Sequence, residues 1–96
     1  MASIDPDSTW TLHPQVSVRP EPFGALLYHF GTRRLSFLKD RTLLDVVERL
    51  ADAPSARAAC IDAGVAETHL PTYLRALGTL AESRMIAPRD AGERAA

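Results

Sequence analysis

The chain has 96 residues, a net charge of −1 and a hydrophobic fraction of 46%, which predict one small globular domain. It lacks the basic excess typical of nucleic-acid-binding domains, and no apolar run reaches the roughly 20 residues needed to span a bilayer. The single cysteine, Cys60, excludes an intrachain disulfide, and no signal-peptide-like segment follows Met1, so we expect a cytoplasmic protein.

Polar, turn-prone residues make up both ends of the chain, at 1–9 and 89–96. Termini of this composition are often mobile, so we expect flexible segments there. The domain itself is predicted to cover residues 10–88.

Three short strands are predicted in the first half of the domain. Residues 15–19 alternate polar and apolar side chains, as a half-buried strand does, and Pro14 and Pro20 bracket them. Residues 25–30 and 33–38 form the second and third candidates.

The second and third strands are predicted to form a hairpin with its turn near residues 29–33. On the third strand, alternation places Leu35 and Phe37 on one face. The opposite face takes Arg34, Ser36 and Leu38.

From Asp40 the apolar spacing becomes helical. Asp40 is predicted to cap a first helix, and Pro54 ends it. Ser55 is predicted to cap a short second helix, after which Gly64 adopts the left-handed conformation. The buried face of the first helix is formed by Leu43, Val46, Val47 and Leu50.

A third helix is predicted to begin at the cap Thr68, with Pro71 in its first turn, and to end near Arg84. Three strands followed by three helices define an α+β fold with the helices on one face of a three-stranded antiparallel sheet. The apolar stripe of the third helix is formed by Leu70, Tyr73, Leu74, Leu77, Leu80 and Ala81.

No catalytic, metal-binding or cofactor-binding pattern is apparent, so we predict a non-enzymatic protein without a cofactor. The histidines His13, His29 and His69 lack metal-ligand spacing and are expected at or partly beneath the surface. Cys60 lies on the inner face of an alanine-rich helix, where core packing is expected. Neither a nucleophile elbow nor a glycine-rich phosphate loop is present.

The adjacent cations Arg33 and Arg34 have two interpretations. They are either a solvated hairpin end or a positive site that attracts an acidic peptide to a strand edge. Tyr73 and Phe37 likewise either pack in the core or line a groove.

Three segments resemble the peptide chaperones of mycofactocin biosynthesis, and the similarity covers nearly all of the predicted domain. They are LHPQV at 12–16, RPEPFGALLYHFG at 19–31 and RRLSFL at 33–38. More distantly, the chain resembles the PqqD-like family, the recognition elements of systems that modify ribosomally made peptides.

This resemblance implies a winged helix-turn-helix-like fold. It implies that the leader segment of a precursor peptide binds as an added antiparallel strand in the cleft between residues 33–38 and the third helix. It also implies a partner radical SAM maturase that modifies the precursor. On this chain the implied peptide-binding residues are Arg33, Arg34, Leu35, Ser36, Phe37, Leu38, Tyr73, Leu77 and Leu80.

Strand addition has a physical basis, because an exposed edge offers unpaired N–H and C=O groups to a peptide. The same edge can pair with a second copy of the chain and form a homodimer. Two alternatives to a peptide chaperone stay open. One is a winged-helix DNA-binding regulator, although the third helix has few cations to bind phosphates. The other is a structural subunit that only docks on a larger enzyme.

Overall fold

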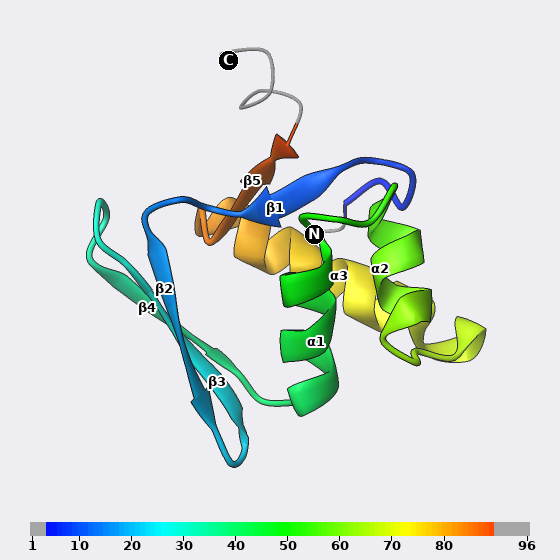
Figure 1. Cartoon of the computed structure of the whole chain (residues 1–96), viewed down its shortest axis with the longest axis horizontal. Coiled ribbons are helices and arrows are strands. Elements are labelled where there is room, and N and C mark those ends of the chain that lie inside the picture. The colour runs from blue at the N-terminus through cyan, green and yellow to red at the C-terminus, as the bar shows by residue number, and fades with distance from the viewer. Residues whose placement is uncertain (1–3, 90–96) are drawn as a thin grey trace.

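The computed structural model describes residues 4–89. The ends that we expected to be flexible at 1–3 and 90–96 lie outside the described residues. Figure 1 shows the three-stranded sheet on one side of the molecule and the helices gathered on the other, with α1 next to the sheet. This arrangement confirms the predicted α+β class and is consistent with a winged-helix description.

The main sheet is antiparallel, with the strands β2 (Val16–Glu21), β3 (Gly24–His29) and β4 (Arg34–Leu38) in sequence order. The predicted strands overlap all three. Pro20, which we expected to end the first strand, lies inside β2 and pairs with Ala25. An edge strand tolerates this proline because its missing N–H faces away from the ladder.

The first two helices begin where the sequence predicts. Before α1 (Arg41–Arg49), the Asp40 carboxylate accepts a hydrogen bond from the Thr42 N–H at 2.8 Å. Before α2 (Ala56–Asp62), the Ser55 hydroxyl accepts one from the Ala58 N–H at 3.1 Å. Both caps satisfy backbone donors that the first turn of a helix leaves unpaired.

The third helix, α3 (Leu70–Glu82), begins after a one-turn 3-10 helix, η1 (Glu67–His69). The predicted cap Thr68 is wrong, because it lies within η1 and His69 occupies the cap position without a side-chain cap bond. The 3-10 turn leads directly into α3, so this helix begins without a side-chain cap.

A second, two-stranded sheet was not predicted. It pairs β1 (Trp10–Leu12) with β5 (Ile86–Pro88), close to the two ends of the described chain. The packed structure also begins earlier than expected, since Ile4 is buried and the Ala56 N–H donates to the Ser8 carbonyl at 2.9 Å.

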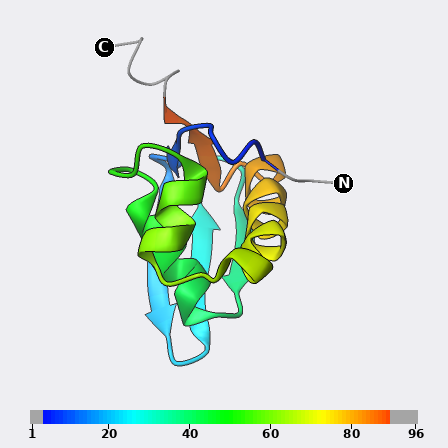
Figure 2. The ribbon, with the colours of Figure 1, turned by 90° about the vertical axis from the view of Figure 1, so that its right-hand side faces the viewer.

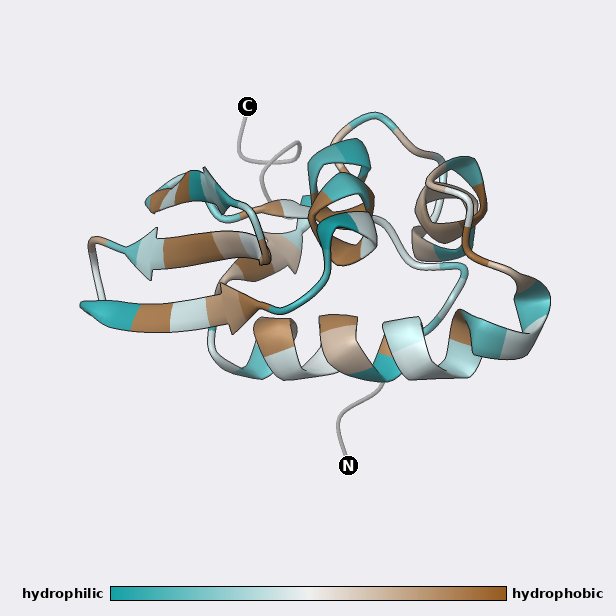
Figure 3. Ribbon diagram, turned by 90° about the horizontal axis from the view of Figure 1, so that it is seen from below, coloured by the Kyte–Doolittle hydropathy of each residue, from teal (hydrophilic) through white to brown (hydrophobic). Residues whose placement is uncertain are grey.

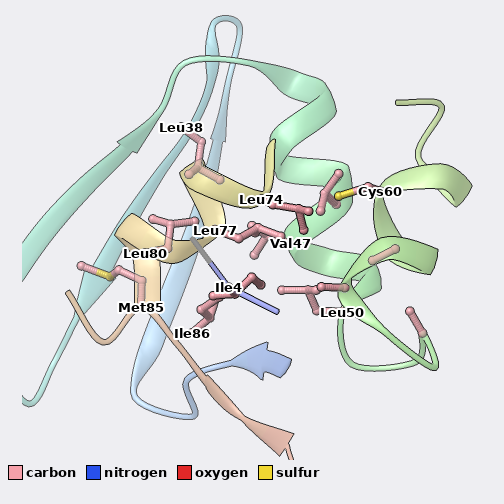
Figure 4. Packing of buried hydrophobic residues seen from close by; sticks show 14 of the residues in the cluster. Ile4, Leu38, Val47, Leu50, Cys60, Leu74, Leu77, Leu80, Met85 and Ile86 are labelled. Atoms are coloured by element: carbon pink, nitrogen blue, oxygen red, sulfur yellow. The ribbon is translucent and has the colours of Figure 1, made fainter. Parts of the chain in front are cut away.

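The core lies mainly between the three helices, as Figure 4 shows, and the main sheet borders it. Leu77 of α3 and Val46 of α1 are fully buried, and Leu38 brings the end of β4 into the same cluster. Within the part of the chain that the structure describes, no helix has the length and apolar character needed to cross a membrane.

Candidate functional site

The backbone of β4 presents an open edge. The Phe30 N–H donates to the Gln15 carbonyl at 2.8 Å, so every second residue of β3 bonds to β2 and the residues between them bond to β4. In the β3–β4 register, the backbone N–H and C=O groups of Leu35 and Phe37 therefore point away from β3. Among residues 4–89, no other strand pairs with them.

The opposite edge of the sheet, on β2, is blunted by proline. Pro20 stands at a position whose N–H would face the free edge, and proline has no N–H. Pro14 and Pro22 flank the same strand. The β4 edge therefore offers alternate N–H and C=O groups without interruption, while the β2 edge does not.

The helix α3 lies next to this open edge. Figures 2 and 3 both show β4 as the strand of the sheet nearest to α3. The end of α3 shares a hollow with Arg34 at the beginning of β4, and Tyr73 in its first turns bonds to Asp40, two residues past the end of β4, so the two elements run in opposite directions. A hollow lies at each end of the edge.

The first hollow is polar and lies at the hairpin turn, with a volume of about 310 Å³. Arg34 contributes one cation and Arg84 a second, against the single carboxylate of Glu82. The excess of positive charge favours an anionic group here. The remaining lining residues are Thr32 and Ser83.

The second hollow, of about 190 Å³, is mostly apolar and lies beyond the end of β4. Leu43, Thr72 and Ala76 line it, and the Tyr73 hydroxyl donates to the carboxylate of Asp40 at its edge. This hydrogen bond is the main cause that raises the pKa of Tyr73, and burial adds to it. The phenol therefore stays a donor at neutral pH.

Tyr73→Phe is expected to lower the free energy of unfolding by about 1–2 kcal/mol, because a hydrogen bond to a carboxylate is lost. The raised pKa means that the unfolded chain releases this proton first as pH rises, so the contribution is present below about pH 10 and declines above it. Urea unfolding near neutral pH and in the alkaline range measures both effects. Tyr28→Phe is the matched control on the sheet, and an equal loss there would contradict the assignment.

The nine predicted binding residues do not all lie on one surface. On β4, the side chains of Leu35 and Phe37 are exposed on the face of the sheet away from the helices. Leu38 is buried on the opposite face, toward the helices. Leu77 and Leu80 of α3 are also buried, with 0% and 5% of their surface exposed, so their side chains offer almost no surface to a bound peptide.

The two arginines at the hairpin differ in position. Arg33 lies in the turn with a φ of 63°, whereas Arg34 begins β4 and lines the polar hollow. The buried His29 holds this turn, because its Nδ1 accepts hydrogen bonds from the backbone N–H groups of Gly31 at 3.0 Å and Thr32 at 3.1 Å. His29 is thus more deeply buried than we expected.

Sequence reasoning missed several residues that line the hollows. Arg84 was taken only as the end of a helix, and its φ of 64° turns the chain beside β4. Thr72 and Ala76 had a detectable signal, since they are four residues apart and flank Tyr73 on one side of α3.

The remaining reactive side chains have structural explanations. Cys60 is fully buried, and burial raises the pKa of its thiol, which opposes formation of a nucleophilic thiolate. The half-buried His13 packs on His29 with ring centroids 4.4 Å apart, and burial, followed by His29 and Arg84, lowers its pKa. Among residues 4–89, no three acidic, histidine or cysteine side chains gather as metal ligands.

An unblocked strand edge beside a helix, with hollows at both ends, is the geometry by which small domains bind extended peptides. The geometry of the site therefore fits the class of peptide-binding modules. The model of the Peptide chaperone MftB family matches residues 9–87, and the chain belongs to this family.

Two curated relatives, both named "Peptide chaperone MftB", are similar over most of their length. The protein of Mycobacterium tuberculosis is 62% identical over 89 residues, which cover 93% of this chain and 82% of the relative. That of Mycolicibacterium smegmatis is 62% identical over 86 residues, covering 90% and 84%. No solved structure matches. The relatives' names confirm the prediction of a peptide chaperone rather than an enzyme.

Proposed function

We propose that the chain binds the leader segment of a ribosomally made precursor peptide by strand addition to β4. It then presents this peptide to a radical SAM maturase in mycofactocin biosynthesis, in the cytoplasm. The supporting observation is the contrast between the two sheet edges, since β4 offers the backbone groups of Leu35 and Phe37 while β2 is blocked by Pro20.

The hollows indicate what the bound segment contains. Side chains of an added strand alternate between the two faces of the sheet, so every second one points toward α3. An antiparallel segment begins near Asp40 and ends near Arg34. We therefore expect an apolar side chain early in it, over the hollow beside Tyr73, and a carboxylate later, near Arg34 and Arg84.

Hydrogen exchange tests strand addition directly. A synthetic precursor peptide is expected to slow exchange of the Leu35 and Phe37 amides, which face the open edge, with little change at Ser36, whose amide already bonds to β3. Protection that misses residues 34–38 would refute pairing at β4. The β2 residues serve as an internal control, because pairing at that edge would protect Val18 instead.

Charge reversal of Arg34 tests the polar hollow. Arg34→Glu is expected to weaken peptide binding roughly three- to tenfold at low salt and less at high salt, because salt screens exposed charges. Arg33→Glu should have a smaller effect, since Arg33 does not line the hollow. The control is Arg75→Glu on the far side of α3. Calorimetric titration that shows equal affinities at low salt would assign both arginines to a solvated turn.

The alternative of a DNA-binding regulator has less support. Arg75 is the one cation in the sequence of α3, and phosphate contacts by several cations supply most of the affinity for duplex DNA. We therefore expect no duplex binding that falls steeply with salt, and a filter-binding titration that showed it would favour the regulator.

A further inference from the structure

The face of the sheet away from the helices is unusually apolar. Four of the five large hydrophobic side chains exposed in the described part of the chain lie there: Phe23, Phe30, Leu35 and Phe37. Figure 3 shows β3 coloured hydrophobic over most of its length and β4 with separate hydrophobic segments. We call these four residues, with Leu26 and Tyr28, the outer apolar face.

Contacts join these residues into one surface. The rings of Phe23 and Phe37 lie 6.4 Å apart, and those of Tyr28 and Phe30 meet edge to face at 5.1 Å. Cross-strand pairing places Leu26 opposite Phe37 and Tyr28 opposite Leu35. The face is therefore continuous from the β2–β3 turn to the β3–β4 turn.

The size of this face suits a transient partner. With half to two-thirds of each side chain exposed, the four exposed residues offer about 400 Å² of apolar surface. That is close to the apolar part of a standard interface, which buries about 800 Å² on each partner. Obligate dimers bury considerably more, and a strand added at β4 would leave Phe23 and Phe30 uncovered.

The positive charge around this face favours a partner of opposite charge. Apart from Arg34, which lines the hollow beside α3, residues 16–39 contain three cations and one carboxylate, a net charge of +2, although the whole chain carries −1. The carboxylate, Glu21, is already paired with Arg19 at 2.9 Å. Two copies placed face to face would bring their positive sheets together, so a partner with carboxylates around an apolar patch is favoured.

We propose that the outer apolar face is the docking surface for the enzyme that receives the peptide, and that this enzyme presents an apolar patch rimmed by carboxylates. The identity of the partner rests on the proposed function. Its position follows from β4, because Leu35 and Phe37 expose their side chains on this face and their backbone groups at the open edge. A protein docked here would lie directly beside the bound strand.

Two titrations of the full-length chain test this proposal, one with the purified radical SAM maturase and one with the synthetic precursor peptide. Replacing both Phe23 and Phe30 by serine is expected to weaken binding to the maturase more than tenfold and to change peptide affinity less than about twofold. Ile61→Ser on α2 is the matched control, since Ile61 is 48% exposed and Phe23 is 49% exposed. Lys39→Glu, which leaves the aromatic residues intact, should weaken binding to the maturase mainly at low salt.

Four results would overturn the docking surface: unchanged affinity of the double variant for the maturase, an equal loss of peptide affinity, a wild-type dimer that the serine variants dissociate, or binding of the face to anionic vesicles in place of the enzyme. Failure of the wild-type chain to bind the peptide would refute the proposed function instead. The two ideas therefore fail in different titrations.

Discussion

Gly24→Ala is expected to lower the free energy of unfolding by about 2–4 kcal/mol, from backbone strain and steric overlap together. Gly24 has a φ of +156°, and a Cβ atom there would lie 2.0 Å from the Leu38 carbonyl oxygen and 2.8 Å from the Asp40 nitrogen. Both are backbone atoms, so no side-chain rotation relieves the overlap. Urea unfolding followed by circular dichroism measures the loss.

Gly64→Ala separates strain from overlap. Gly64 also has a positive φ, +94°, but nothing lies within 4 Å of an added Cβ. We expect a loss of about 1–2 kcal/mol there, from the left-handed conformation alone. If both variants lost the same stability, close approach of the two backbones at Gly24 would not be the cause.

Gly24→Ala should also affect the peptide-binding site. The Leu38 carbonyl ends β4, and Asp40 caps α1 and bonds to Tyr73 beside the apolar hollow. Displacement of this segment would move one end of the open edge relative to α3. Gly24→Ala is therefore expected to weaken peptide binding even at temperatures where the variant stays folded.

The features that were predictable from sequence are those with local causes. Asp40 and Ser55 cap their helices because a short polar side chain reaches an amide two or three residues on. Gly64 takes a positive φ directly after its helix. Alternation likewise placed Leu35 and Phe37 on a common face of β4.

The features that were missed depend on contacts between distant segments. β1 and β5 have three residues each, too few for an alternation pattern, and they meet only because the whole domain brings Leu12 beside Ile86. Tertiary packing also decides which residues of α3 line the apolar hollow. Leu77 and Leu80 are buried in the core, whereas Thr72 and Ala76 border the hollow.

Pro20 suggests a strand end in the sequence, yet in the fold it distinguishes the two edges of the sheet. A proline suggests the end of a strand, because it cannot donate to a ladder. In the folded sheet it stands on the outer edge of β2, where no ladder bond is needed. It thereby distinguishes the two edges of the sheet and leaves β4 as the edge suited to pairing.

Leu35→Pro should place the same block on β4. We expect it to weaken peptide binding by more than tenfold, because one edge N–H is lost and the ring occupies the position of the incoming strand. The Leu35 N–H points away from β3, so the β3–β4 ladder keeps its hydrogen bonds and the loss of stability should stay below about 1 kcal/mol. Calorimetric titration with the precursor peptide, together with urea unfolding, measures both quantities.

Leu35→Ala is the matched control, since it removes the exposed side chain and keeps the backbone donor. If the edge binds the peptide through its backbone, the alanine variant retains most of its affinity while the proline variant does not. Equal losses in the two variants would show that the peptide recognises the side chain on the outer apolar face. Unchanged affinity in Leu35→Pro would rule out strand addition at β4, because an added strand would lose one hydrogen bond and meet the proline ring at this position.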